Sequence, residues 1–168
     1  MQTRIGPLDP LAAAVRFLVA LLFVLLIASV FAQVVFRYLL QMPLIWAEDV
    51  NTFTFIWLAF LGGSLGVRYR MHFGIDTALD MLSPGGQAIL RLLIDLGIVV
   101  FSFYMLKEGW AFTAVSRGMR TFATGLPMVW MYAAVPAGGA LCVIFALEDS
   151  LRVVREGRRS TPHKMEAR

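Results

Sequence analysis

The sequence predicts an all-α integral membrane protein, a single membrane domain over residues 1–168 with four transmembrane helices and a short amphipathic interfacial helix between the second and third. Hydrophobic residues make up 59% of the chain and charged residues 15%, and the mean hydropathy is +0.74. These values are far from those of ordinary soluble domains. A helix needs about 20 apolar residues to cross the hydrocarbon layer, so four spans use most of the chain. No room remains for a soluble catalytic domain.

The first span is expected over about residues 12–36. Asp9 and Pro10 fit the N-cap and the first position of a helix. Residues 17–36 form an uncharged run that Arg37 closes. Residues 30–32 resemble a signal-peptidase site, but the apolar run is long for a signal peptide and further spans follow it. We therefore expect an uncleaved first helix.

The second span is expected over about residues 48–67, with charges that suit the ends of a helix. Glu48 and Asp49 open it and Arg68 follows it, where the helix dipole favours negative and positive charge respectively. Small residues share one face of this helix, and two of them form a Gly-xxx-Gly pair: Ala59, Gly62, Gly63 and Gly66. Such a face predicts the close approach of another helix, in this chain or in a partner.

Residues 68–91 form the longest polar connection between the predicted spans. Ile75, Leu79 and Leu82 fall on one side of a helix there. This apolar stripe predicts the short amphipathic helix at the membrane interface.

The third span is expected over about residues 88–108, and it contains charged residues. Arg91 and Asp95 are four residues apart near its start and can pair with each other. Lys107 and Glu108 are taken as its end. An ionisable residue inside a span is a functional candidate by default, but a local ion pair or a subunit contact would also explain Asp95.

The fourth span is expected over about residues 126–148, inside the uncharged run 121–147. Pro127 is expected to start the helix and Pro136 to kink it. Ala134, Gly138 and Cys142 form a second stripe of small residues. A charged tail follows over residues 152–168.

The basic residues predict the orientation. Four spans put both termini on one side of the membrane, and 11 of the 15 lysines and arginines fall on that side. The positive-inside rule therefore predicts both termini in the cytoplasm.

The placement of the polar residues argues against most enzyme sites. Glu48 and His72 lie beyond opposite ends of the second span, about 30 Å apart or more, so they cannot act on one substrate. Cys142 is the single cysteine, and His72 and His163 are far apart in the sequence. We therefore expect no catalytic residues, no cofactor and no metal site. The net positive charge comes mostly from the C-terminal tail, which on a membrane protein indicates orientation rather than nucleic-acid binding, so we expect no nucleic-acid partner.

Motifs in a fixed order resemble one family of membrane proteins. They are Arg37, Pro43-Leu44, Trp46-Ala47-Glu48-Asp49, Trp57-Leu58-Ala59-Phe60-Leu61-Gly62, Arg68, His72 and Asp76, then Gly125-Leu126-Pro127, Trp130, Tyr132 and Pro136. Together they resemble the small membrane subunit of TRAP (tripartite ATP-independent periplasmic) transporters, over about residues 10–150 with the same four-span plan. Asp49 stands where that family usually has glutamate, and Gly63 where alanine is common.

The resemblance implies partners rather than a chemical activity of this chain. In the family, a large elevator-type membrane subunit carries the substrate and sodium sites, and a periplasmic binding protein delivers organic acids (carboxylates). This chain would be the non-catalytic scaffold of such a sodium-coupled importer in the bacterial inner membrane. The candidates for subunit contact are Arg37, Trp46, Glu48, Asp49, Gly62, Gly66, Arg68, His72 and Asp95.

Two other functions are compatible with a small membrane protein of this size. A small membrane-anchor subunit of a redox or other membrane enzyme would need histidine ligands inside its spans, and neither histidine lies in one. An autonomous small transporter would show internal repeats or broken helices with buried polar groups. Only Asp95 and the expected kink at Pro136 point that way.

Overall fold

The computed structural model describes residues 8–69 and 84–159, and its regular elements are all helices. They are α1 (Asp9–Tyr38), α2 (Ile45–Arg68), α4 (Pro84–Val115), the 3₁₀ turn η1 (Ser116–Gly118), α5 (Val129–Tyr132) and α6 (Ala134–Arg159). The predicted all-α class is confirmed. The expected interfacial helix with Ile75, Leu79 and Leu82 lies outside the described residues.

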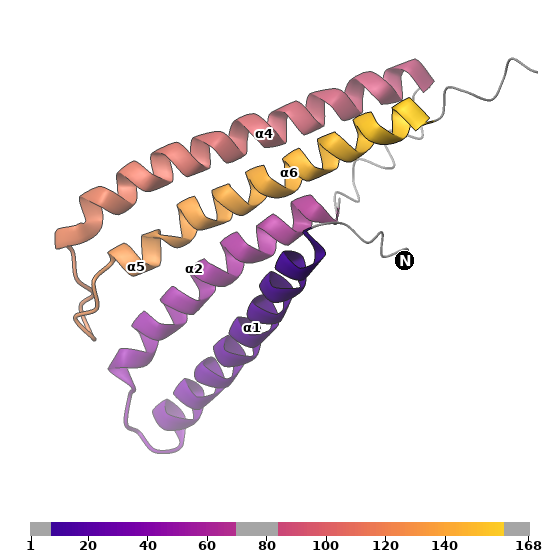
Figure 1. Cartoon of the computed structure of the whole chain (residues 1–168). Helices are drawn as coiled ribbons and strands as arrows, with labels where there is room; N and C mark the ends of the chain where they lie inside the picture. The colour runs from indigo at the N-terminus through magenta and orange to yellow at the C-terminus, as the bar shows by residue number, and fades with distance from the viewer. Residues whose placement is uncertain (1–7, 70–83, 160–168) are drawn as a thin grey trace, which may run out of the picture.

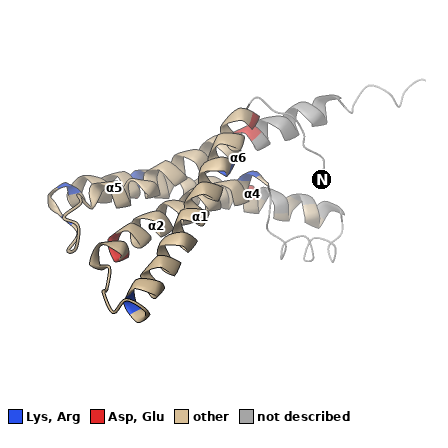
Figure 2. Cartoon of the chain, turned by 90° about the horizontal axis from the view of Figure 1, so that it is seen from below, with Lys and Arg blue, Asp and Glu red and all other residues tan. Residues whose placement is uncertain are grey.

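The long helices lie side by side in one layer, in the order α1, α2, α6, α4 (Figure 1). α2 packs against α1 and α6, and α6 packs against α2 and α4. Consequently α1 and α4 form the two edges of the layer. The C-terminal end of α1 lies apart from α4 and α5 (Figure 2), whereas α2 stays in contact with α5.

Four stretches are long and apolar enough to cross a membrane: Asp9–Tyr38, Ile45–Arg68, Leu93–Gly118 and Val129–Glu148. The most apolar part of α1 has no buried residue within the chain. Phe17, for example, is 72% exposed. Such a surface suits the hydrocarbon of a bilayer and not water.

The third stretch differs from the expected span. The expected end at Lys107 and Glu108 lies inside α4, which continues to Val115. The two residues are adjacent and have opposite charges, so together they add no net charge to the helix. The expectation that the helix ends at these charged residues was therefore wrong.

Adjacent glycines let α6 pack closely on both sides. A Cβ atom at Gly138 would lie 2.8 Å from Phe60 Cβ on α2, and one at Gly139 would lie 2.9 Å from the backbone nitrogen of Leu106 on α4. Ala134 and Cys142 are buried as well. The predicted small-residue stripe on the fourth span is therefore a packing face.

A proline divides the last span into α5 and α6. Pro136 has no N–H to donate to the Tyr132 carbonyl, and its ring would clash with that carbonyl in a continuous helix. The chain accordingly leaves the helix at Ala133, between α5 and α6. The predicted distortion at Pro136 is confirmed, whereas Pro127 precedes α5 and is not its first residue.

Candidate functional site

One buried charge cluster joins three helices at the end of the layer where α1 begins. Arg68, at the end of α2, donates from Nη1 to Glu148 Oε2 on α6 over 2.5 Å and from Nη2 to Asp9 Oδ1 on α1. The Arg68 and Glu148 side chains are only 10% and 9% exposed. The guanidinium also lies 5.1 Å from the centre of the buried Phe145 ring, in cation–π contact. We call these four residues the Arg68 cluster.

The Arg68 cluster continues into the apolar core of the chain. Ala12, Val15, Leu61 and Leu65 are buried together with Phe145. Arg68 was expected from the sequence to contact another subunit or to stabilise the end of its helix. The structure shows that its charge is matched within the chain, by acids from the first and last spans.

At the opposite end of the layer, Asp49 holds the loop between α4 and α5. Its Oδ2 accepts hydrogen bonds from both the backbone nitrogen and the hydroxyl of Thr124, each at 2.8 Å. The Thr124 hydroxyl also lies 2.8 Å from that of Thr121. Because Asp49 is near the start of α2, these bonds fix the loop to the second span.

The loop itself is an ordered hairpin with one fully exposed aromatic ring. Thr121 N–H donates to Leu126 O, and Arg120 Nη1 donates to Gly125 O. Gly125 has φ +68°, a conformation that glycine adopts without strain. Phe122, at the tip, is completely exposed.

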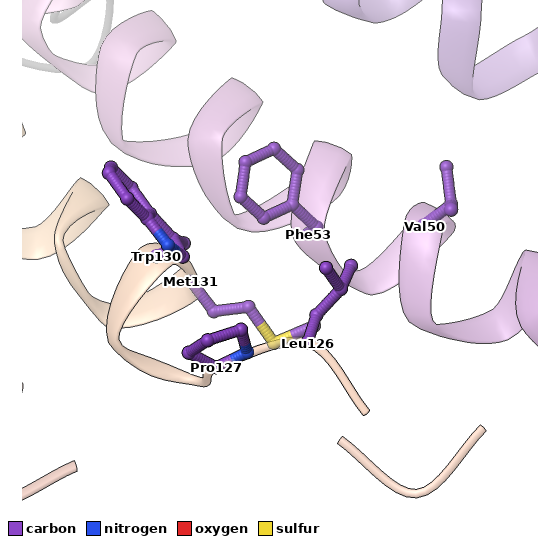
Figure 3. A pocket seen from close by; sticks show the side chains of 6 residues that line it. All are labelled: Val50, Phe53, Leu126, Pro127, Trp130 and Met131. Atoms are coloured by element: carbon purple, nitrogen blue, oxygen red, sulfur yellow. The ribbon is translucent and has the colours of Figure 1, made fainter. Parts of the chain in front are cut away.

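A cavity of about 240 Å³ lies between α2 and the start of α5 (Figure 3). It is lined by apolar side chains and one tryptophan: Val50, Phe53, Leu126, Pro127, Trp130 and Met131. The Trp57 indole N–H, one turn further along α2, donates to Trp130 O over 3.0 Å. No lining residue can ionise or act as a nucleophile, so this cavity offers nothing for acid–base or covalent chemistry.

Three other predicted contact residues lie on the surface near this end. Arg37, Trp46 and Glu48 are all exposed, and the Trp46 side chain is 51% exposed. Within the described residues no ion pair joins Arg37 to Glu48. Their side chains are therefore accessible to lipid, water or a partner.

The glycine face predicted on the second span is open in this chain. A Cβ atom at Gly62 or Gly66 would have no neighbour within 4 Å. The close helix contacts are made instead at Gly138, Gly139 and Gly109, of which the last two were not singled out from the sequence. A partner helix against Gly62 and Gly66 stays a prediction.

Two predicted residues are less fully described. Asp95 is partly buried on α4, but its expected pairing with Arg91 involves a side chain outside the described set. His72 lies outside the described residues. Among the residues that the structure does describe, no group of three histidine, cysteine or acidic side chains could hold a metal ion.

Sequence reasoning missed the acidic partners of Arg68. Asp9 was interpreted as a helix cap, and Glu148 was used only as the end of the fourth span. A usable signal was present, because Asp9, Arg68 and Glu148 all lie at span ends on the same predicted side of the membrane. Buried charges need partners, so such a coincidence points to a cluster.

Comparison with known proteins gives consistent matches. Residues 26–156 match the family described as tripartite ATP-independent periplasmic transporters, DctQ component. A TRAP transporter small permease protein of Haemophilus influenzae is 30% identical over 112 residues, which cover 67% of this chain and 70% of that protein. The C4-dicarboxylate TRAP transporter small permease protein DctQ of Vibrio cholerae is 27% identical over 95 residues, 56% of this chain and 41% of that protein. The sialic acid TRAP transporter permease protein SiaT of Haemophilus influenzae is 26% identical over 150 residues, 84% of this chain but 23% of that protein.

Proposed function

The chain belongs to the DctQ family of small membrane subunits of TRAP transporters, and from this membership we propose that it is the non-catalytic scaffold of a sodium-coupled importer of organic acids. It is a multi-pass protein of the bacterial inner membrane and a transporter component, not an enzyme. In the proposal, a large elevator-type subunit carries the substrate and sodium sites. A periplasmic binding protein delivers the substrate.

One observation carries the scaffold proposal: among the described residues, buried and partly buried charged groups hold this chain's own helices together. Arg68 bonds to acids on α1 and α6, and Asp49 bonds to the α4–α5 loop. The described cavity is apolar. A carboxylate substrate would need hydrogen-bond donors or a positive charge facing an accessible site, whereas the buried Arg68 guanidinium is bonded to acids of this chain.

The partner and substrate proposals draw on the relatives. The SiaT match covers most of this chain but only 23% of SiaT, so a segment similar to this chain occurs within a much longer permease. This supports association with a large membrane subunit. The relatives' names include C4-dicarboxylate and sialic acid transporters, which supports a carboxylate as the substrate class.

The proposed orientation puts the Arg68 cluster near the cytoplasm and the Asp49–Thr124 contact near the periplasm. It follows from the basic residues of the sequence and can be tested by thiol labelling in intact cells, with Cys142 replaced by serine. A cysteine at Gln41 should react with an impermeant reagent, and one at Ser160 should be shielded. Labelling at Ser160 but not at Gln41 would reverse the orientation.

Reconstitution tests the function. The chain alone in vesicles should transport no organic acid under a sodium gradient. Vesicles that contain this chain and the large subunit, supplied with the periplasmic protein, should take up the organic acid under the same gradient. Uptake by this chain alone would contradict the scaffold proposal. Full uptake by the large subunit and periplasmic protein without this chain would contradict it as well.

A further inference from the structure

Two charged residues lie on the exposed surface of α4, inside a stretch apolar enough to span a membrane. Lys107 and Glu108 fall within Leu93–Gly118, and their side chains are 68% and 62% exposed. Lys107 Nζ lies 3.6 Å from Glu108 Oε1. Neither the Arg68 cluster nor the Asp49–Thr124 contact involves them.

The helix contacts place this pair near the middle of the layer's height. Leu106 lies against Gly139, and the adjacent Gly138 lies against Phe60 on α2. A helix rises 1.5 Å per residue, so Phe60 is about 12 Å from Arg68 and about 18 Å from Glu48. Those two residues flank an apolar stretch about 30 Å long, the thickness of a hydrocarbon layer. Lys107 and Glu108 therefore lie near the depth of its centre.

The pair also points away from the rest of the chain. Ser102, Gly109 and Ser116 are buried, and Gly109 contacts Val135 and Pro136 of α6. With 3.6 residues per turn, Lys107 lies about 160° around the helix from Gly109. Because α4 is an edge of the layer, no other described helix covers this side (Figure 1).

Lipid is a poor neighbour for these groups. Neighbouring residues on a helix do not face each other, and a 3.6 Å contact leaves most of the lysine donors and carboxylate lone pairs without a hydrogen bond. Near mid-depth, neither side chain can extend to the aqueous interface. Charged residues at such depth almost always face protein or a water-filled cavity.

We propose that the outward face of α4, centred on Lys107 and Glu108, docks against a transmembrane segment of the large subunit that presents polar groups of complementary charge. The proposal rests on the proposed function, since it names the contact surface for that partner. Each charge gains an opposite charge in the complex. Tyr104 and Ala111 are exposed on either side of Lys107, one helical turn away, and belong to the same face.

The test uses the full complex, with this chain tagged and co-expressed with the large subunit. In the double variant Lys107→Leu, Glu108→Leu, recovery of the large subunit with this chain should fall at least tenfold, while membrane insertion of this chain stays unchanged or improves. The matched control is Phe23→Leu, Val24→Leu, two adjacent exposed positions on α1 at the other edge. It should leave recovery unchanged.

Photo-crosslinking locates the partner directly. A photoreactive residue at Tyr104 should form an adduct with the large subunit, and one at Phe23 should not. Suppose that the wild-type chain assembles with the large subunit, the double leucine variant assembles equally well, and the photoreactive residue at Tyr104 gives no protein adduct. The outward face of α4 is then lipid-exposed and the inference is wrong. An adduct with a second copy of this chain would also overturn it. Failure of the wild-type chains to associate would instead refute the proposed function.

Discussion

Substitution of Arg68 should destabilise the chain more than substitution of either of its acidic partners. Arg68→Met removes the cation between two carboxylates, and one of these, Glu148, is only 9% exposed. Removal of one partner from a buried ion pair costs roughly 3–5 kcal/mol. Glu148→Gln leaves Arg68 its second acid and keeps a hydrogen-bonding group, so we expect about 1–3 kcal/mol. Asp9→Asn affects a side chain that is 38% exposed, and an exposed pair contributes about 0–1 kcal/mol.

The buried thiol provides the assay. Cys142 is the single cysteine and is buried, so a thiol-reactive dye should report unfolding of the purified chain in detergent. The expected order of destabilisation is Arg68→Met, then Glu148→Gln, then Asp9→Asn. Arg37→Met is the matched control, because Arg37 is an exposed arginine at the end of α1. If Arg68→Met unfolds no more easily than Arg37→Met, or if Asp9→Asn is the most damaging change, the cluster does not hold the three helices together.

Three further predictions concern other contacts. Asp49→Ala removes both hydrogen bonds to Thr124. The rate of amide hydrogen exchange should therefore rise at least tenfold in the loop over residues 120–127. No rise there would contradict the anchoring role of Asp49. Gly139→Val should disrupt the α4–α6 contact and lower the unfolding midpoint of the isolated chain. Gly62→Ala should not lower it, because a Cβ atom there meets no neighbour in this chain. Equal effects of the two substitutions would refute the packing argument. Glu48→Arg should reduce co-purification with the large subunit without affecting membrane insertion, whereas normal assembly with a several-fold shift in apparent substrate affinity would place Glu48 on a substrate path instead.

The sequence predicted the helices well because each span follows a local rule. An uncharged run of sufficient length must be helical in a bilayer, and it continues until charged or helix-breaking residues end it. The rule failed at Lys107 and Glu108, where adjacent opposite charges lie inside a helix. A single sequence does not distinguish charges that end a span from charges that meet a partner.

Packing partners were predictable only in part. Gly62 and Gly66 have the same spacing as Gly138 and Cys142, yet only the second pair lies on a face packed within the chain. Spacing determines which residues share a helix face, but the partner of that face depends on tertiary contacts. The partners of Arg68 were missed for the same reason, because they lie 59 and 80 residues away along the chain.

The single-layer arrangement makes the protein unusually sensitive to the thickness of its bilayer. Neighbouring helix axes lie about 8–10 Å apart and a helix is about 10 Å across, so four helices in a row form a slab about 35–40 Å wide and one helix thick. In a compact bundle much of each helix is hidden from the acyl chains, whereas in the isolated slab both broad faces meet them. Any mismatch between helix length and acyl-chain length then acts on every helix, at fractions of a kcal/mol per Å. Short-chain and long-chain lipids should therefore tilt or strain the slab as a whole.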